Sequence, residues 1–233
     1  MKLFFLTLTF VSFSFFAIAQ SLPYNIYPPD TLFITYHSTS TKIHYQEKIE
    51  EFKKAPLATG DIVFLGNSIT ELGGSWGYRT GWRNVKNRGI SGDVTEGVLK
   101  RLGEITYTKP KAVFLLIGIN DINIAATTPQ YVADNILAIA KIIRKGSPDT
   151  KLYVQSIFPT NTASIKEKIQ QTNALLKKKA CRKTYTLLNT HDLFADEADG
   201  IKKEYTNDGL HLSEQGYTLW AEYLKKKLPK LAN

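Results

Sequence analysis

Three residues of this sequence have the types needed for nucleophilic chemistry. Ser68 follows the apolar run 62–65 after two turn-forming residues, and Asp208 and His211 stand three positions apart near the C-terminus. In a helical turn, residues at that spacing share a face. A serine hydroxyl becomes a good nucleophile when a histidine accepts its proton and a carboxylate orients that histidine. Together the three residues predict an acyl-transfer site.

Each of these residues also has a simpler interpretation. Serine is a favoured N-cap, so Ser68 could only begin a helix, and the stretch 66–70 alone supports both interpretations equally. Asp208 and the glycine after it could form an ordinary turn. The adjacent pair His191-Asp192 is a rival acid–base pair, although neighbouring side chains in an extended segment point apart. We rank that pair below Asp208 and His211.

Two further polar groups are expected near Ser68. The turn 89–92 and Asn120 each follow an expected strand, and the carboxyl ends of parallel strands meet at one edge of a sheet. The N–H groups of Ser68 and Gly92 and the side-chain amide of Asn120 could stabilise an oxyanion there. Alternatively, the first segment is a tight loop and Asn120 belongs to an ordinary turn.

Expected strands and helices alternate along the chain, which predicts an α/β fold whose parallel sheet has helices on both faces. The glycine-rich segment 71–83 is expected to be irregular. Asp93 is expected to be the N-cap of the helix that begins at Val94. The expected strands are 61–65, 85–88, 112–117, 151–157 and 185–189. The expected helices are 42–54, 94–103, 129–145, 165–179 and 213–228.

The N-terminus has the layout of a secretory signal peptide. A lysine, the apolar run 3–16 and a small-x-small motif at 17–19 follow one another. The run is short for a membrane span, so we expect cleavage after Ala19, no stable membrane anchor, and a periplasmic or extracellular location. Residues 20–59 are expected to form an extended leader and a helix that pack on a single domain, residues 60–233.

Composition excludes few functional classes. The chain has 233 residues, 43% of them hydrophobic, and a net charge of +9. Its lysines cluster where helices should end, at 177–179 and 225–227, where they complement the helix dipole, so no nucleic-acid partner is expected. Cys181 is the only cysteine and is expected to be buried at a helix end. The four histidines lack a paired metal-binding spacing, so no metal or cofactor is expected.

Four stretches resemble the sequence blocks of the SGNH (GDSL-type) hydrolases, in the family's order. They are 66–70, 89–93, 118–121 and 208–211. The second and third look most like those of exported bacterial esterases and of the platelet-activating-factor acetylhydrolase subgroup. The resemblance implies a flavodoxin-like three-layer α/β/α sandwich with five parallel strands, and a carboxylic ester hydrolase.

By matching motif positions, the resemblance implies that Ser68 is the nucleophile, His211 the general base and Asp208 the residue that orients it. It also implies an oxyanion hole formed by Ser68, Gly92 and Asn120. The sequence departs from the family motif at Asn67, where the family has Asp, and at Ile69, where it has Leu.

The expected export, the lack of a long apolar lid and the aromatic residues in the segment 71–83 suggest a small acyl group, such as acetyl, on a carbohydrate. Aromatic faces stack on sugar rings, but these aromatics could equally pack the loop. A lipase, lysophospholipase or thioesterase that acts on longer acyl chains is the alternative, and a non-catalytic glycan-binding protein is a third possibility. The candidate substrate-binding residues are Asn67, Trp76, Trp82 and Arg88.

Overall fold

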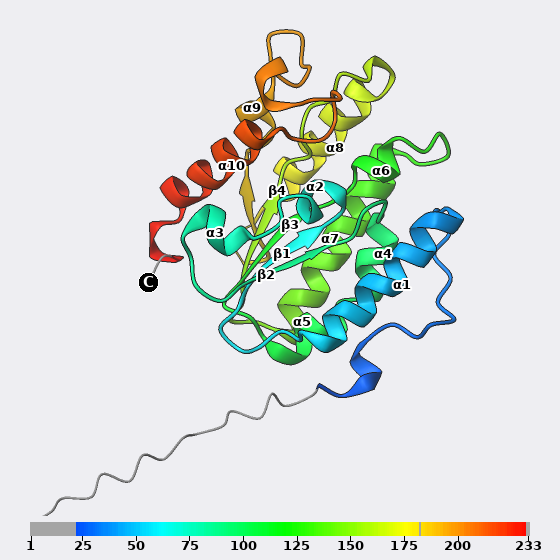
Figure 1. Cartoon of the computed structure of the whole chain (residues 1–233). Helices are drawn as coiled ribbons and strands as arrows, with labels where there is room; N and C mark the ends of the chain where they lie inside the picture. Colours follow the sequence, from blue (N-terminus) through cyan, green and yellow to red (C-terminus); the bar gives the residue numbers. More distant parts are fainter. Residues whose placement is uncertain (1–21, 182, 232–233) are drawn as a thin grey trace, which may run out of the picture.

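A computed structural model describes residues 22–181 and 183–231 of the chain, so the expected signal peptide lies outside the described residues. Its centre is a five-stranded parallel sheet with the strand order β2-β1-β3-β4-β5 (Figure 1). The predicted parallel α/β/α fold is thus confirmed. The strands are β1 (Ile62–Gly66), β2 (Val85–Gly89), β3 (Ala112–Leu116), β4 (Lys151–Gln155) and β5 (Thr186–Leu188).

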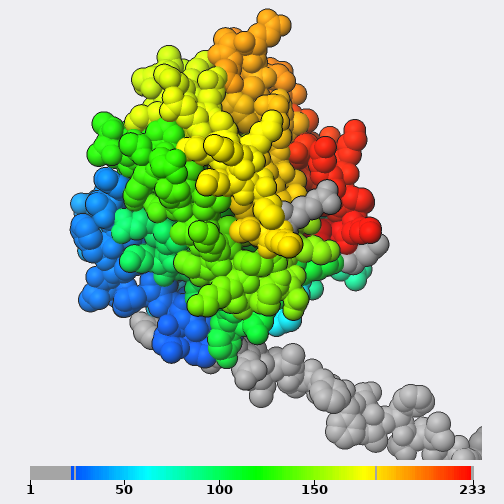
Figure 2. All heavy atoms as spheres, turned by 180° about the vertical axis from the view of Figure 1, so that it is seen from behind, coloured from blue at the N-terminus to red at the C-terminus, as the bar shows by residue number. Residues whose placement is uncertain are grey.

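Helices cover both faces of the sheet. In Figure 2, α7 and α8 cover the face that is turned toward the viewer, whereas α3 and α10 lie together on the other side of the sheet in Figure 1. Among the described residues, no helix is long and apolar enough to cross a membrane. The longer helices are α1 (Thr39–Lys54), α7 (Pro129–Gly146), α8 (Lys166–Lys179) and α10 (Glu214–Lys227). The shorter ones are α2 (Ser68–Glu71), α3 (Trp76–Thr80), α4 (Thr95–Lys100), α5 (Gly103–Thr108), α6 (Ile119–Ile122) and α9 (His191–Phe194). Short 3-10 helices span Tyr24–Ile26, Ala163–Ile165, Lys203–Tyr205 and Pro229–Leu231.

The core is built around the two central strands, β1 and β3, whose residues are all buried. Aromatic rings fill the layer between the sheet and α10. Trp76 stacks on Phe64 with ring centroids 4.1 Å apart, and it meets Trp220 edge to face at 4.6 Å. Trp82 lies over Phe114 at 5.6 Å. Large aromatic surfaces of this kind dominate the stability of a core.

The N-terminal segment carries a smaller apolar cluster of its own. Tyr45, Ile49 and Phe52 lie on one face of α1 and pack on Ile90 and Val94, which follow β2. The expected helix 42–54 is therefore present and longer than expected, and it attaches to the domain through apolar contacts.

The prediction that residues 71–83 are irregular is wrong, because they contain α3. The Ser75 hydroxyl caps its N-terminus by accepting a hydrogen bond from the Tyr78 N–H at 3.3 Å, and Gly81 ends it with a φ of +70°. A serine start and a left-handed glycine end are the usual signals for a short helix. The many glycines of this segment favoured an irregular structure, and the helix signals were therefore not recognised in the sequence.

The expected helix 94–103 is also wrong, since it is broken into α4 and α5. The backbone leaves the helical region at Arg101, and Gly103 then packs against the 3-10 helix 24–26, where a Cβ atom would lie 2.1 Å from a carbonyl oxygen. Asp93 is not the N-cap, because Val94 holds that position and the Asp93 carboxylate binds Arg101 instead.

Helix α8 ends at the surface. Its last residues, Lys177 to Lys179, are exposed, and Cys181 just beyond them is exposed as well. The prediction that Cys181 is buried is therefore wrong, because Leu176 is the last buried residue of α8 and the chain from Lys177 to Cys181 lies at the surface.

The aromatic layer gives a stability prediction. We expect Trp76→Ala to lower the free energy of unfolding by about 3–5 kcal/mol, because it removes a buried ring from between Phe64 and Trp220. Urea unfolding followed by far-UV circular dichroism measures the change. Tyr78→Ala on the same helix is the matched control: its side chain is 90% exposed, so we expect a change within about 0.5 kcal/mol. Equal losses in both variants would contradict this account of the core.

Candidate active site

The position of Ser68 is fixed by the residues just before it. Gly66 ends β1 in close contact with β3, where a Cβ atom would lie 2.2 Å from the Leu116 carbonyl oxygen. Asn67 is the N-cap of α2, and its side-chain oxygen accepts a hydrogen bond from the Ile69 N–H at 3.2 Å. Asn67 therefore does the capping, which leaves the Ser68 hydroxyl available for other partners.

The Ser68 hydroxyl faces a histidine and an aspartate from the other end of the chain. Its Oγ lies 3.0 Å from Nε2 of His211, and Nδ1 of His211 lies 2.7 Å from Oδ2 of Asp208. The His211 side chain is 32% exposed and that of Asp208 is 54% exposed. The structure thus brings the three sequence-predicted residues into one hydrogen-bonded line that is open to solvent.

The loop 206–212 holds His211 in this line, although not as the helical turn we expected. Oδ1 of Asp208 accepts hydrogen bonds from the N–H groups of Leu210 and His211 at 2.9 and 2.8 Å, and Gly209 has a φ of +81°. The Thr206 hydroxyl donates to the His211 carbonyl oxygen at 2.7 Å. The spacing of three is met by an Asx-type turn, in which the aspartate binds its own loop.

The electrostatics of the line favour a charged Asp208. Partial burial opposes ionisation, but the hydrogen bonds from the His211 ring and from the N–H groups of His211 and Leu210 outweigh it and lower the pKa of Asp208 to about 2. An ionised carboxylate only accepts hydrogen bonds, so Nδ1 of His211 carries the proton. Nε2 is then free to accept the proton of the Ser68 hydroxyl, as a general base must.

The expected oxyanion donors other than Ser68 follow β2 and β3, at the sheet edge where β1 ends before Ser68. The Asp93 N–H closes a turn onto the Ile90 carbonyl oxygen at 3.1 Å, and Gly92, third in that turn, has a φ of +80°. Such a φ favours glycine. Among the described residues, the N–H groups of Ser68 and Gly92 have no acceptor. The Asn120 amide donates to the Asp93 carbonyl oxygen at 2.9 Å, which holds Asn120 beside the turn.

A buried guanidinium, which the sequence did not reveal, ties these elements together. Arg101 donates to the Gly66 carbonyl oxygen at 2.9 Å, to the Arg88 carbonyl oxygen at 2.8 Å and to the Asp93 carboxylate at 3.0 Å. It therefore joins the ends of β1 and β2 to the turn that contains Gly92. The only local signal for it is a break in the apolar pattern at the end of the expected helix.

Asp121, next to Asn120, anchors the third strand end. Its carboxylate is fully buried and accepts hydrogen bonds from the Thr95 N–H at 3.0 Å and from the Thr95 hydroxyl at 2.5 Å. Burial raises the pKa of Asp121 to about 6, although the Thr95 hydrogen bonds oppose the shift. The Asp121 side chain thus points into the protein toward Thr95, and this contact holds the chain next to Asn120.

The structure does not support the four candidate substrate-binding residues. Trp76 and Trp82 are core residues, 1% and 4% exposed. Arg88 is buried in a bidentate ion pair with Glu104, with both distances 2.9 Å. Asn67 is also buried, and its amide nitrogen has no hydrogen-bond partner among the described residues. The types of these residues were suitable, but burial removes their side chains from contact with a ligand.

His191 and Asp192 do not form a pair with each other. Nε2 of His191 lies 2.7 Å from Oδ1 of Asp199, and its Nδ1 lies 2.8 Å from the Ile157 carbonyl oxygen. Asp192 accepts a hydrogen bond from Asn189 instead. Within the described ranges, no group of three or more His, Cys, Asp or Glu side chains is placed to hold a metal ion.

Comparisons with known proteins bear on the family and the fold of the chain. Residues 64–219 match the sequence model of the GDSL-like lipase/acylhydrolase family. No curated protein gives a significant match. Among solved structures, the chain is similar to a protein from Streptococcus pneumonia described as a platelet activating factor. The two share 28% identity with a TM-score of 0.68, over 81% of this chain and 92% of that one.

Two more distant structures share the fold. A GDSL-like lipase from Bacteroides thetaiotaomicron is 24% identical with a TM-score of 0.68, over 80% of this chain and 97% of that one. A variant of an acetyl-xylooligosaccharide esterase from Geobacillus is 18% identical with a TM-score of 0.61, over 74% and 95% of the two chains.

The buried carboxyl of Asp121 gives a prediction on pH and stability. Its folded pKa of about 6 lies above an ordinary value of about 3.9, so its stabilising contribution is complete below pH 4 and is lost as pH rises through 6. An asparagine side chain at this position does not titrate. We therefore expect the stability of Asp121→Asn relative to wild type to rise by about 2–3 kcal/mol between pH 4 and pH 8.

Urea unfolding of both proteins at several pH values measures this difference, in which the other titrating groups cancel. Asp134→Asn, at an exposed position on α7, is the matched control and should leave the difference flat. A flat difference for Asp121→Asn as well would show that the carboxyl is not held in its neutral form.

Proposed function

Because the chain belongs to the GDSL-like lipase/acylhydrolase family, we propose that it is a serine esterase that removes small acyl groups, such as acetyl, from carbohydrates. The observation that carries the proposal is the unbroken hydrogen-bonded line from Ser68 through His211 to Asp208, with distances of 3.0 and 2.7 Å. These are the contacts that a serine nucleophile, its base and the orienting carboxylate require.

The geometry supports a two-step acyl transfer. Oγ of Ser68 attacks the acyl carbon while Nε2 of His211 takes the hydroxyl proton. The oxygen that becomes negative is met by the N–H groups of Ser68 and Gly92 and by the Asn120 amide. The alcohol leaves with the proton from His211, and a water molecule, activated by the same nitrogen, then hydrolyses the Ser68 ester. Asp208 stays ionised throughout and stabilises the imidazolium that forms.

The open position of the site supports a small acyl group on a bulky alcohol. The side chains of His211 and Asp208 are both accessible, so a large polar substrate can approach them from solvent. Of the aromatic residues in the segment after Ser68, Tyr78 is 90% exposed, and Leu72 nearby is 55% exposed. Tyr78 replaces the two buried tryptophans as the aromatic that could contact a sugar ring.

Structural neighbours offer further support for the carbohydrate. They include the acetyl-xylooligosaccharide esterase, an acetyl xylan esterase with a TM-score of 0.62 and a carbohydrate esterase family 3 protein with a TM-score of 0.57. The apolar run 3–16 and the small residues after it support export. An exported esterase would meet glycans of the cell envelope or its surroundings.

A panel of acetylated saccharides tests the proposal. We expect the wild-type protein to release acetate from at least one of acetylated xylan, pectin or sialic acid, and Ser68→Ala to lower kcat by at least about 10³-fold, because it removes the attacking oxygen. His211→Ala should lose activity to a similar degree. Acetate release is measured by a coupled enzymatic assay, and circular dichroism checks that both variants fold.

Esters of p-nitrophenol with graded acyl chains separate the alternatives. Highest kcat/KM with acetate or propionate supports the small acyl group, whereas a maximum at long chains would favour a lipase or thioesterase. No turnover of any ester by the wild type would favour a glycan-binding protein that kept the fold. Activity in His211→Ala close to wild type would show that the base is wrongly assigned.

A further inference from the structure

One face of the N-terminal segment is directed at the turn that contains Gly92. His37, Thr41, His44 and Lys48 follow one another at spacings of four, three and four, which places them along one side of α1 and its N-terminal end. All four precede residues 64–219, the part of the chain that matches the family. His37 and Thr41 contact the turn directly, whereas His44 and Lys48 contact Glu71, which binds Ser91 of the turn.

The first contacts hold the far end of the turn. Nε2 of His37 lies 3.1 Å from Oδ1 of Asp93, and both side chains are buried. Thr41 packs against Gly92 so closely that a Cβ atom on Gly92 would lie 2.6 Å from the Thr41 hydroxyl oxygen. Gly92, which has a left-handed backbone conformation, is thus covered by Thr41 of α1.

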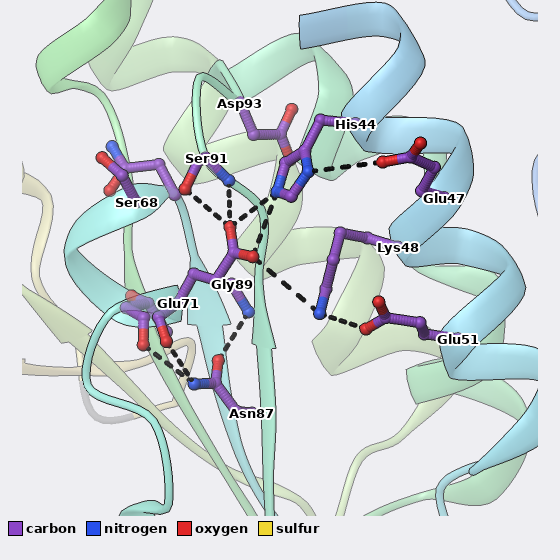
Figure 3. Close-up of polar contacts among 12 residues, drawn as sticks. His44, Glu47, Lys48, Glu51, Ser68, Glu71, Asn87, Gly89, Ser91 and Asp93 are labelled. Carbon is purple, nitrogen blue, oxygen red and sulfur yellow. Dashed lines mark hydrogen bonds and ion pairs between the residues drawn. The ribbon is translucent and has the colours of Figure 1, made fainter.

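The near end of the turn is held through Glu71, the last residue of α2. Oε2 of Glu71 accepts hydrogen bonds from the Ser91 N–H at 2.5 Å and from the Ser91 hydroxyl at 2.6 Å. Nε2 of His44 lies 3.0 Å from both carboxylate oxygens, and Nζ of Lys48 lies 3.9 Å from Oε1. Figure 3 shows the Glu71 carboxylate between Ser91 on one side and His44 and Lys48 on the other.

Glu71 is held in its charged form in this position. Its side chain is only 20% exposed, and burial opposes ionisation, but the hydrogen bonds from Ser91 and His44 outweigh burial and lower the pKa of Glu71. Hydrogen bonds to an ionised acceptor are about twice as strong as those between neutral groups. The Ser91 N–H is therefore firmly oriented.

The two hydrogen bonds to Glu71 hold Ser91, and the Asp93 N–H closes the turn onto the Ile90 carbonyl oxygen. The peptide group between Ser91 and Gly92, whose N–H belongs to Gly92, is therefore held from both sides. That N–H has no acceptor among the described residues. A donor stabilises an oxyanion only if it already points to where the charge develops. Within the described residues, the Glu71 carboxylate accepts hydrogen bonds from Ser91 and none from the Gly92 N–H, so it can hold the turn without occupying the hole.

We propose that Glu71, braced by His44 and Lys48 of α1, is a positioning residue that holds the Gly92 N–H in the oxyanion hole. The inference rests on the proposed function, because it needs an oxyanion to form at Ser68. It makes α1 part of the catalytic architecture although α1 lies outside the matched region.

Holding α1 on the domain does not require this charged cluster. Tyr45, Ile49 and Phe52 already attach α1 through the apolar cluster, along the neighbouring stripe of the helix. Loss of the Glu71 carboxylate should therefore change the turn more than it changes the fold.

Two substitutions at one position test the proposal. Glu71→Met removes both acceptors at similar size, and we expect kcat for p-nitrophenyl acetate to fall by about 10- to 100-fold with KM changed less than about twofold, because only transition-state stabilisation is lost. Glu71→Gln keeps one oxygen, which can still accept both hydrogen bonds from Ser91, so its kcat should stay within about fivefold of wild type. Glu50→Gln, on α1 where Glu50 pairs with Lys53, is the matched control and should keep full activity.

The thermal midpoint is measured for every variant, and Ser91→Ala serves as a milder change should Glu71→Met fail to fold. It removes one of the two hydrogen bonds, and we expect a two- to fivefold fall in kcat. Wild-type kcat in Glu71→Met, or in Ser91→Ala if only that variant folds, would overturn the inference. The inference would also be overturned if Glu71→Met and Glu71→Gln lost kcat equally and the loss matched the fraction of protein that is unfolded.

Failure of the proposed function gives a different result. If wild-type protein neither hydrolyses the ester nor reacts covalently at Ser68 with a p-nitrophenyl phosphonate, the proposed function is overturned and this inference with it. If wild type does both while Glu71→Met matches it, only the inference is overturned.

Discussion

The buried guanidinium of Arg101 is the interaction on which the candidate site depends. It donates to carbonyl oxygens at the ends of β1 and β2 and to the Asp93 carboxylate, all within 3.0 Å. Removing one partner of such a buried pair costs about 3–5 kcal/mol, because the other charge is left without compensation. The strand ends that carry Ser68 and the Gly92 turn are therefore fixed relative to each other by a contact that solvent does not reach.

The contact with Arg101 also explains why Asp93 does not cap a helix. Its carboxylate is fully used by Arg101, His37 and the Val94 N–H, and its carbonyl oxygen accepts the Asn120 amide. One residue thus connects the N-terminal segment, the turn and the third strand end. The proposed oxyanion donors follow three different strands, and Asp93 contacts the residues that support them.

Sequence alone predicted the sheet and the contacts of Ser68, His211 and Asp208 with one another, but not the residues that support them. The central strands β1 and β3 are continuous apolar runs, and such runs are local signals. The motifs at Ser68, Gly92, Asn120 and His211 are short and stand where strands end. Arg101 and Glu71 act through contacts with residues far away in sequence, and no periodic pattern marks a charged residue as buried. The prediction that Trp76 and Trp82 bind substrate is unsupported for a related reason. In the sequence, an aromatic residue in a glycine-rich segment gives the same pattern whether it packs inward or binds a ligand.

The two halves of the candidate site differ in how firmly they are held. Ser68, Gly92 and Asn120 stand on strand ends joined by buried contacts, whereas His211 and Asp208 belong to a loop at the surface. That loop is organised mainly by its own hydrogen bonds, through Asp208 and Thr206, and by the Gly209 carbonyl oxygen, which accepts from the Asn161 N–H and the Thr160 hydroxyl at 2.9 Å. An oxyanion hole needs fixed dipoles, because reorganising them during the reaction would cost the stabilisation they provide. The base has a different task, since it must exchange protons with a leaving alcohol and then with water. Its place in an accessible loop beside a rigid sheet edge suits both requirements.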